Sequence, residues 1–141
     1  VLSARQDLKL ARLAYVPTIA KDGRYELQAV VIDSDNKFAT NKFTPTVSGN
    51  YYLFARGQVT GTIGDNSTVY IAIRKNGSGV ALHEMKVWEA GSYSLSVSVD
   101  TIVSSDTDDY FDVVMYNSSG TPPIRHGSSF TYFGGYKLIG G

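Results

Sequence analysis

The stretch that decides the fold is FTPTVSGNYYLFARGQV, residues 43–59. Gly49 tolerates positive φ, and its neighbours Ser48 and Asn50 can hydrogen-bond to their own backbone, so the chain can reverse direction here. We therefore predict two short strands joined by a tight turn. Pro45 lies in the first of them and cannot donate to a β-ladder, which places that strand at a sheet edge or makes the proline its start.

The strand after this turn is apolar on both faces in its first half. Side chains alternate across a strand, so Tyr51 and Leu53 share one face. Tyr52 and Phe54 share the other face. An antiparallel strand in a lone two-layer sandwich needs only one apolar face. The other face predicts a further buried surface, and a neighbouring subunit is its simplest source.

The composition is that of one β-rich domain. The 141 residues include 10 Tyr, 6 Phe and 1 Trp, and only 18% are charged, which suits strands with adhesive faces. The 13 basic and 13 acidic side chains balance, which argues against nucleic-acid binding. There is no cysteine for a disulfide or a metal. No apolar run approaches the ~20 residues that span a bilayer, and no signal-peptide pattern is present.

Further strand patterns fill the chain, separated by turn signals at intervals of about 8–12 residues. Asn76-Gly77 is the strongest hairpin signal, and we expect a loop at residues 61–66. Alternation is most regular in residues 93–99, which we expect to turn Tyr93, Leu95, Val97 and Val99 inward and the serines outward. The expected strands are residues 8–16, 25–32, 68–75, 80–87, 93–99, 110–116 and 130–139. About nine or ten strands without a helix predict a sandwich or barrel.

The first residues allow two interpretations. Val1, Ala4, Leu8, Ala11 and Tyr15 have the spacing of a coiled-coil seam, as at the end of a stalk. Residues 8–16 also alternate as a strand. We therefore expect residues 1–7 to end a stalk or linker and residues 8–141 to form the domain. Because the chain begins with valine, we expect it to be a piece of a longer protein.

Three motifs, in this order, resemble the globular head of the C1q and tumour-necrosis-factor superfamily. They are NKFATNKFTPTVSGNYYLF at residues 36–54, RKNG at 74–77 and FGGYKLI at 133–139. The resemblance covers about residues 28–139 and implies a ten-stranded jelly-roll sandwich that assembles as a homotrimer. The fold-signature positions that it implies are Phe43, Gly49, Tyr51, Asn76, Gly77 and Gly135.

The chain departs from many members of this superfamily. It has Ser48-Gly49 in place of proline-glycine, it lacks their cysteines, and residues 1–7 contain no collagen repeat. It looks most like the cysteine-free C-terminal knob of a bacteriophage tail needle or tail fibre. That resemblance implies a non-enzymatic virion protein at the tail tip, which contacts a bacterial cell-surface component and takes part in genome delivery through the envelope.

The expected partner of the domain is itself. Three expected strands are apolar on both faces: residues 8–16, the strand after the Gly49 turn, and residues 130–139. The resemblance places the last of these at a trimer axis. The predicted trimer-interface residues are Leu10, Leu13, Tyr15, Tyr52, Phe54, Phe130, Tyr132, Phe133 and Tyr136.

The sequence offers little catalytic chemistry. His83-Glu84 begins like a zinc-protease motif, but Val87 stands where the second histidine is needed. His126 lies in a long loop, where a metal role at a trimer axis competes with a plain loop residue. No phosphate loop or nucleophile elbow is present. We therefore expect no catalytic residue, no cofactor and no enzyme activity.

One acidic loop allows two readings. Asp106, Asp108 and Asp109 could supply oxygen ligands to a calcium ion. A solvated turn explains the same residues and is the favoured reading.

Two other functions stay open. A secreted C1q-like ligand-binding or adhesion module, located outside the cell, shares the fold and would follow a signal peptide and collagen repeat. A polysaccharide depolymerase would need paired carboxylates that face one groove, whereas most acids here gather in one loop.

Overall fold

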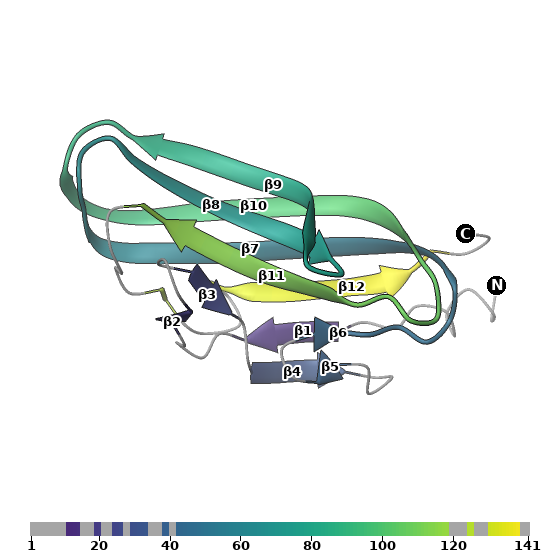
Figure 1. Cartoon of the computed structure of the whole chain (residues 1–141). Coiled ribbons are helices and arrows are strands. Elements are labelled where there is room, and N and C mark those ends of the chain that lie inside the picture. Colours follow the sequence, from purple (N-terminus) through teal and green to yellow (C-terminus); the bar gives the residue numbers. More distant parts are fainter. Residues whose placement is uncertain are drawn as a thin grey trace.

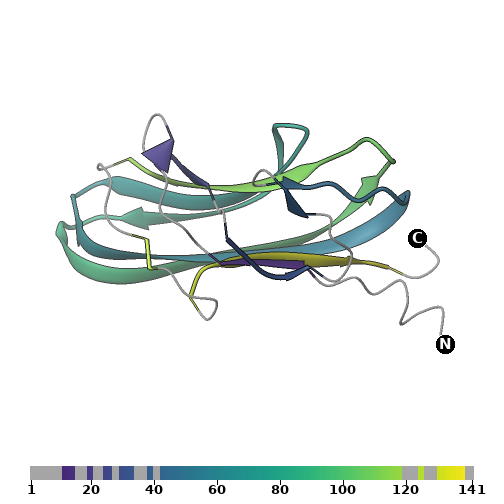
Figure 2. The same cartoon turned by 90° about the horizontal axis from the view of Figure 1, so that it is seen from below.

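The fold is two stacked layers of antiparallel strands (Figures 1 and 2). The computed structural model describes residues 11–14, 19–20, 24–26, 29–33, 38–39, 42–118, 124–125 and 130–138, with side chains from residue 42 onward. Within these ranges, all regular secondary structure is β-strand, and no helix is present. The all-β antiparallel sandwich predicted from the sequence is therefore confirmed.

The strands vary widely in length. Six short ones, β1 to β6, come first, and the longer ones follow from Gly49 onward. Their bounds are β1 Ala11–Ala14, β2 Ile19–Ala20, β3 Arg24–Glu26, β4 Ala29–Asp33, β5 Phe38–Ala39, β6 Lys42–Phe43, β7 Gly49–Ile63, β8 Ser67–Lys75, β9 Ser78–Val87, β10 Gly91–Ser105, β11 Phe111–Asn117 and β12 Tyr132–Lys137.

One layer has five strands and the other has seven. The five-stranded sheet has the order β10-β7-β12-β1-β4. In the seven-stranded sheet, β8 lies between β9 and β11. The far edge of β11 pairs with β3 through Val114–Tyr116 and with β6 through Phe111. The short strands β2 and β5 extend this sheet beyond β3 and β6.

The longest pairing among the described strands joins β7 to β10. It runs without a break from Gly49 opposite Ser105 to Ile63 opposite Gly91. The predicted loop at residues 61–66 is thus wrong for its first half, because Gly61 stays in the ladder opposite Tyr93. The turn is confined to Asp65 and Asn66, and Asn66 has a φ of 53°.

The core fills the space between the sheets with alternate side chains of the long strands. Leu53, Ile71, Val97 and Phe111 are fully buried there. In β10 the predicted inward side chains either belong to this core or pack against it, and Ser92, Ser94 and Ser98 are exposed. The alternation read from residues 93–99 is confirmed.

The predicted hairpin at Asn76-Gly77 is also confirmed. These two residues form the turn between β8 and β9, with φ values of 51° and 86°. Both angles lie in the left-handed region that asparagine and glycine tolerate best and that a two-residue hairpin turn requires. A bulge interrupts the register next to the turn, between Ile73 and Arg74.

A histidine side chain links the two sheets where two of their edge strands meet. Strand β9 is an edge strand of the seven-stranded sheet, β10 is an edge strand of the five-stranded sheet, and the two lie beside each other (Figure 1). The backbone N–H of Ser98 in β10 donates to Nδ1 of His83 in β9 over 3.1 Å. His83 is therefore a structural acceptor between the sheets.

The chain enters β1 near one end of the sandwich, and two turns lie at the other. Ala11 pairs with Gly135, which in turn pairs with Leu53 near the start of β7. Ile63, at the end of β7, lies about 33 Å from Leu53 along this strand. The β7–β8 and β9–β10 turns lie beyond Ile63, at the other end of the sandwich (Figure 1). Trp88 is in the second of these turns and is 74% exposed.

Candidate functional site: an aromatic surface on the five-stranded sheet

Four aromatic rings line up on the outer face of the five-stranded sheet. Tyr52 and Phe54 come from β7, and Tyr132 and Tyr136 from β12. Ring centroids are 5.8 Å apart for Tyr52 and Phe54, 5.4 Å for Tyr52 and Tyr136, and 6.0 Å for Phe54 and Tyr132. We call these four residues the aromatic surface.

The pleat of two paired strands creates this surface. In β7, Tyr51, Leu53 and Ala55 are buried in the core, so the residues between them face outward. Tyr136 pairs with Tyr52, which brings two of the outward rings together across the strands. All four rings are half-buried. The outward placement of Tyr52 and Phe54 predicted from the sequence is confirmed.

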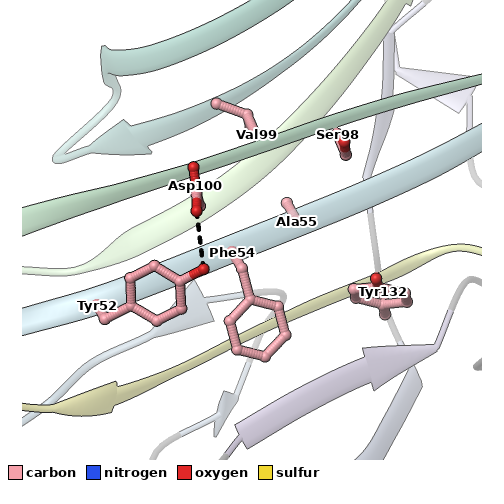
Figure 3. A pocket seen from close by; sticks show the side chains of 7 residues that line it. All are labelled: Tyr52, Phe54, Ala55, Ser98, Val99, Asp100 and Tyr132. Atoms are coloured by element: carbon pink, nitrogen blue, oxygen red, sulfur yellow. Dashed lines mark hydrogen bonds between the residues drawn. The ribbon is translucent and has the colours of Figure 1, made fainter.

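An acidic side chain borders the aromatic surface. The Tyr52 hydroxyl donates to Oδ2 of Asp100 over 2.8 Å (Figure 3). The hydrogen bond to this carboxylate is the main cause that raises the pKa of Tyr52 above 10.0; burial and the carboxylate charge add to it. A hollow of about 250 Å³ lies here, and Tyr52, Asp100, Phe54 and Tyr132 are among the residues that line it (Figure 3).

A polar network continues the same face toward the β7–β8 turn. Arg56 Nη2 and Gln58 Nε2 each donate to Ser96 Oγ over 3.1 Å. Arg125 Nη1 donates to Gln58 Oε1 over 3.2 Å. The guanidinium of Arg125 lies 3.5 Å from the centre of the Phe130 ring. The aromatic surface therefore ends at hydrogen-bonded side chains.

The structure corrects one of the predicted interface residues. Phe133 was predicted at the interface, but it alternates with the outward Tyr132 and is fully buried in the core of its own subunit. Phe130 is half-buried in a turn, so the last strand begins at Tyr132 rather than at residue 130. Leu13 lies in β1 opposite Phe133, and its side chain is outside the described part. Leu10 and Tyr15 lie outside the described residues.

The fold-signature positions have physical roles in the structure. Phe43 packs edge-on against Tyr51 in the core, with centroids 5.8 Å apart. Gly49 has a φ of 145°, which lies outside the range that other residues adopt readily. Gly135 allows β12 to approach β7, because a methyl group there would lie 2.8 Å from the Tyr52 carbonyl oxygen.

Protein donors surround the carboxylate of Asp109. It accepts hydrogen bonds from Asn76 Nδ2 over 2.7 Å and from the Asp106 backbone N–H over 2.8 Å, and it pairs with Lys75 Nζ over 3.1 Å. Chiefly the Asp106 N–H, then Asn76 and Lys75, lower the pKa of Asp109 to about 2. Asp106 and Asp108 are exposed. The described residues contain no group of three His, Asp or Glu placed to hold a metal ion.

The role of Asp100 could not be read from the sequence. Asp100 follows the outward serines, so its side of the sheet was predictable. Its position opposite Phe54 depends on the register between β7 and β10, to which no local pattern points. Ile102, which is opposite Tyr52 and 63% exposed, was missed for the same reason.

Comparison with known proteins assigns no family. No protein-family model matches the chain, and no curated protein sequence matches it. In the described part of the chain, no helix is long and apolar enough to cross a membrane.

Proposed function

We propose that this domain is a homotrimer and that the aromatic surface is its subunit interface. The observation that carries the proposal is the run of four adjoining rings on a sheet face that has no third layer over the described residues. Aromatic residues are enriched at protein interfaces, where they bury large areas at low entropic cost. The nearby exposed Ile102 extends the apolar area.

The strand order supports a jelly roll as the finer description of the fold. From β7 to β12, consecutive strands alternate between the two sheets except at the β8–β9 hairpin. Such alternation is what two Greek keys folded into a double sheet require. The main layers are then β10-β7-β12-β1 and β9-β8-β11, the second completed by β3 and β6.

We infer further that the trimer is the non-enzymatic knob at the tip of a phage tail needle or fibre. In the virion it contacts the bacterial cell surface and takes part in genome delivery. The resemblance of residues 36–54, 74–77 and 133–139 carries this step. The geometry is compatible with it, because β1 starts at one end of the sandwich and the exposed Trp88 lies at the other. A stalk joined to β1 would leave the Trp88 end outermost.

Light scattering at low micromolar concentration tests the assembly. The wild-type protein should have three times the chain mass of 15.3 kDa. Phe54→Glu should dissociate it, because three added charges would meet at the interface. Leu82→Glu is the matched control, since Leu82 is an exposed residue of the other sheet. A monodisperse 15.3 kDa wild type, or a trimeric Phe54→Glu variant, would reject the proposal.

The coding sequence upstream of Val1 tests the biological assignment. A needle or fibre predicts long heptad repeats there. A signal peptide followed by collagen repeats would overturn it in favour of a secreted module.

A further inference from the structure

The seven-stranded sheet carries a hollow on its outer face, away from the aromatic surface. Its volume is about 230 Å³, below the range of pockets that hold drug-sized molecules. It lies over β8, β9 and β11, and the residues that line it include Tyr70, Ala72, Arg74, Gly79, Leu82 and Val114. Its size suits a ligand of one ring.

The floor of the hollow consists of two small side chains, Ala72 and Val114. Ala72 pairs with Val114 on one side and with Leu82 on the other, so these three residues form a row across the sheet. Ile71, Ile73 and Val113, which flank the first two in sequence, are core residues. Ala72 and Val114 thus face outward, yet each is only 5% exposed. Taller neighbours therefore enclose them.

The two walls differ in chemistry. On one side Tyr70 stacks on Tyr116, with centroids 5.0 Å apart, and only Tyr70 lines the hollow. On the other side Arg74 forms an ion pair with Asp112, including a bond from Nε to Oδ1 of 2.8 Å. Tyr70 and Arg74 are four residues apart on β8, which separates the walls by about 13 Å.

Charge narrows the class of ligand. Arg74 is the only charged residue among those described that line the hollow, and Asp112 neutralises it. This balance disfavours a phosphate or a metal cation. A purely apolar ligand fits poorly as well, because both walls carry polar groups. A neutral ring with one C–H face and a rim of hydroxyl groups matches the aliphatic floor, the tyrosine and the ion pair together.

We propose that this hollow binds a single neutral sugar ring, as a residue of a surface glycan. The site goes beyond the proposed trimer and does not depend on it, because the hollow and the aromatic surface lie on opposite sheets.

Gly79 offers a way to block the hollow without disturbing the fold. It pairs with Arg74 on the outer face, and a methyl group at this position would have no neighbour within 4 Å. Gly79→Leu should therefore fill the space and leave the core intact. Ser78→Leu is the matched control, since Ser78 is an exposed residue of the same hairpin that does not line the hollow.

Saturation-transfer-difference NMR tests the proposal with methyl glycosides of glucose, galactose, mannose and N-acetylglucosamine at millimolar concentration. We expect transfer to the ring C–H protons of at least one sugar. Gly79→Leu should abolish it, Ser78→Leu should retain it, and Tyr70→Ala should weaken binding about tenfold. Circular dichroism verifies that each variant is folded.

Absence of transfer to all four sugars would overturn the site, as would transfer that Gly79→Leu leaves unchanged. Binding of a sugar by a monomeric protein would support the site and reject only the trimer.

Discussion

Asn76 and Tyr110 hydrogen-bond to each other in both directions. The backbone N–H of Asn76 donates to the Tyr110 carbonyl over 2.9 Å, and the Tyr110 N–H donates to Asn76 Oδ1 over 3.0 Å. With the bond from Asn76 Nδ2 to Asp109, this pair ties the β8–β9 turn to the loop before β11. One turn residue thus fixes two connections that are distant in sequence.

We predict that Asn76→Ala lowers the free energy of unfolding by about 1–3 kcal/mol, measured by urea denaturation. The substitution removes both side-chain bonds and leaves alanine at a positive φ. Asn76→Gly separates the two effects, because glycine removes the bonds without the backbone cost. It should lose less stability than Asn76→Ala. An Asn76→Ala protein as stable as the wild type would contradict this role.

Asp109 should make stability depend on acid pH. Its pKa is lowered from 3.8 to about 2 in the folded protein. The stability that the ionised Asp109 contributes to the folded protein is therefore complete above pH 3.8 and is lost as the pH falls through about 2. We expect the stability gap between the wild type and Asp109→Asn to narrow over this range in denaturation experiments. A gap that stays constant from neutral pH to pH 2 would refute the assignment.

Tyr52 should ionise at a higher pH than an ordinary tyrosine. Its hydrogen bond to Asp100 favours the protonated phenol and raises its pKa above 10.0. The bond stabilises the fold below that value and is lost as the pH rises through the raised pKa. The difference in tyrosinate absorbance between the wild type and Tyr52→Phe measures the transition. Asp100→Asn should move it to lower pH, and an unmoved transition would rule out the pair as its cause.

Two glycines should respond differently to alanine. A methyl group at Gly57 would contact the flexible end of Met115, whereas one at Gly135 would contact both the Leu53 side chain and the Tyr52 backbone oxygen. Each substitution should cost about 1–3 kcal/mol of stability through overpacking.

Double-mutant cycles by urea denaturation distinguish them. Met115→Val should relieve part of the cost of Gly57→Ala, since it shortens the obstructing side chain. Leu53→Val should not rescue Gly135→Ala, because the backbone oxygen remains 2.8 Å from the added methyl. Equal rescue in both cycles would contradict the prediction, because it would show that the Tyr52 backbone moves to make room for the added methyl group.

Trp88 gives a direct optical test of the turn between β9 and β10. It is the only tryptophan in the chain and is 74% exposed. We expect emission like that of free indole in water and strong quenching by acrylamide, both nearly unchanged on unfolding. The proposed trimer should behave identically, since Trp88 lies away from the aromatic surface. A blue-shifted emission would contradict this exposure.

Local patterns predicted the parts of the fold that depend on neighbours in sequence. The Asn76-Gly77 turn and the alternation around Val97 follow from backbone preference and from the period of a half-buried strand. The extension of β7 to Ile63 was missed, because Gly61 and its neighbours have the composition of a loop. Pairing with β10 overrides that weak local preference.

The candidate site likewise contains residues that local sequence patterns placed correctly and residues that they did not. Tyr52 and Phe54 were placed correctly, since only their own strand decides which way they face. Phe133 was wrongly placed in the interface. It lies on the opposite side of its strand from Tyr132 and Tyr136, but an aromatic residue by itself does not reveal whether the core or a partner covers it. Asp100 became visible only once the register of two strands was known.

The contact between His83 and Ser98 also affects how molecules meet at high concentration. An outer strand such as β10 offers free N–H and C=O groups onto which a strand of another molecule can add. Here the imidazole already occupies the Ser98 N–H over 3.1 Å. An incoming strand would have to displace that ring before it could extend the sheet, so the fold itself hinders aggregation at this edge.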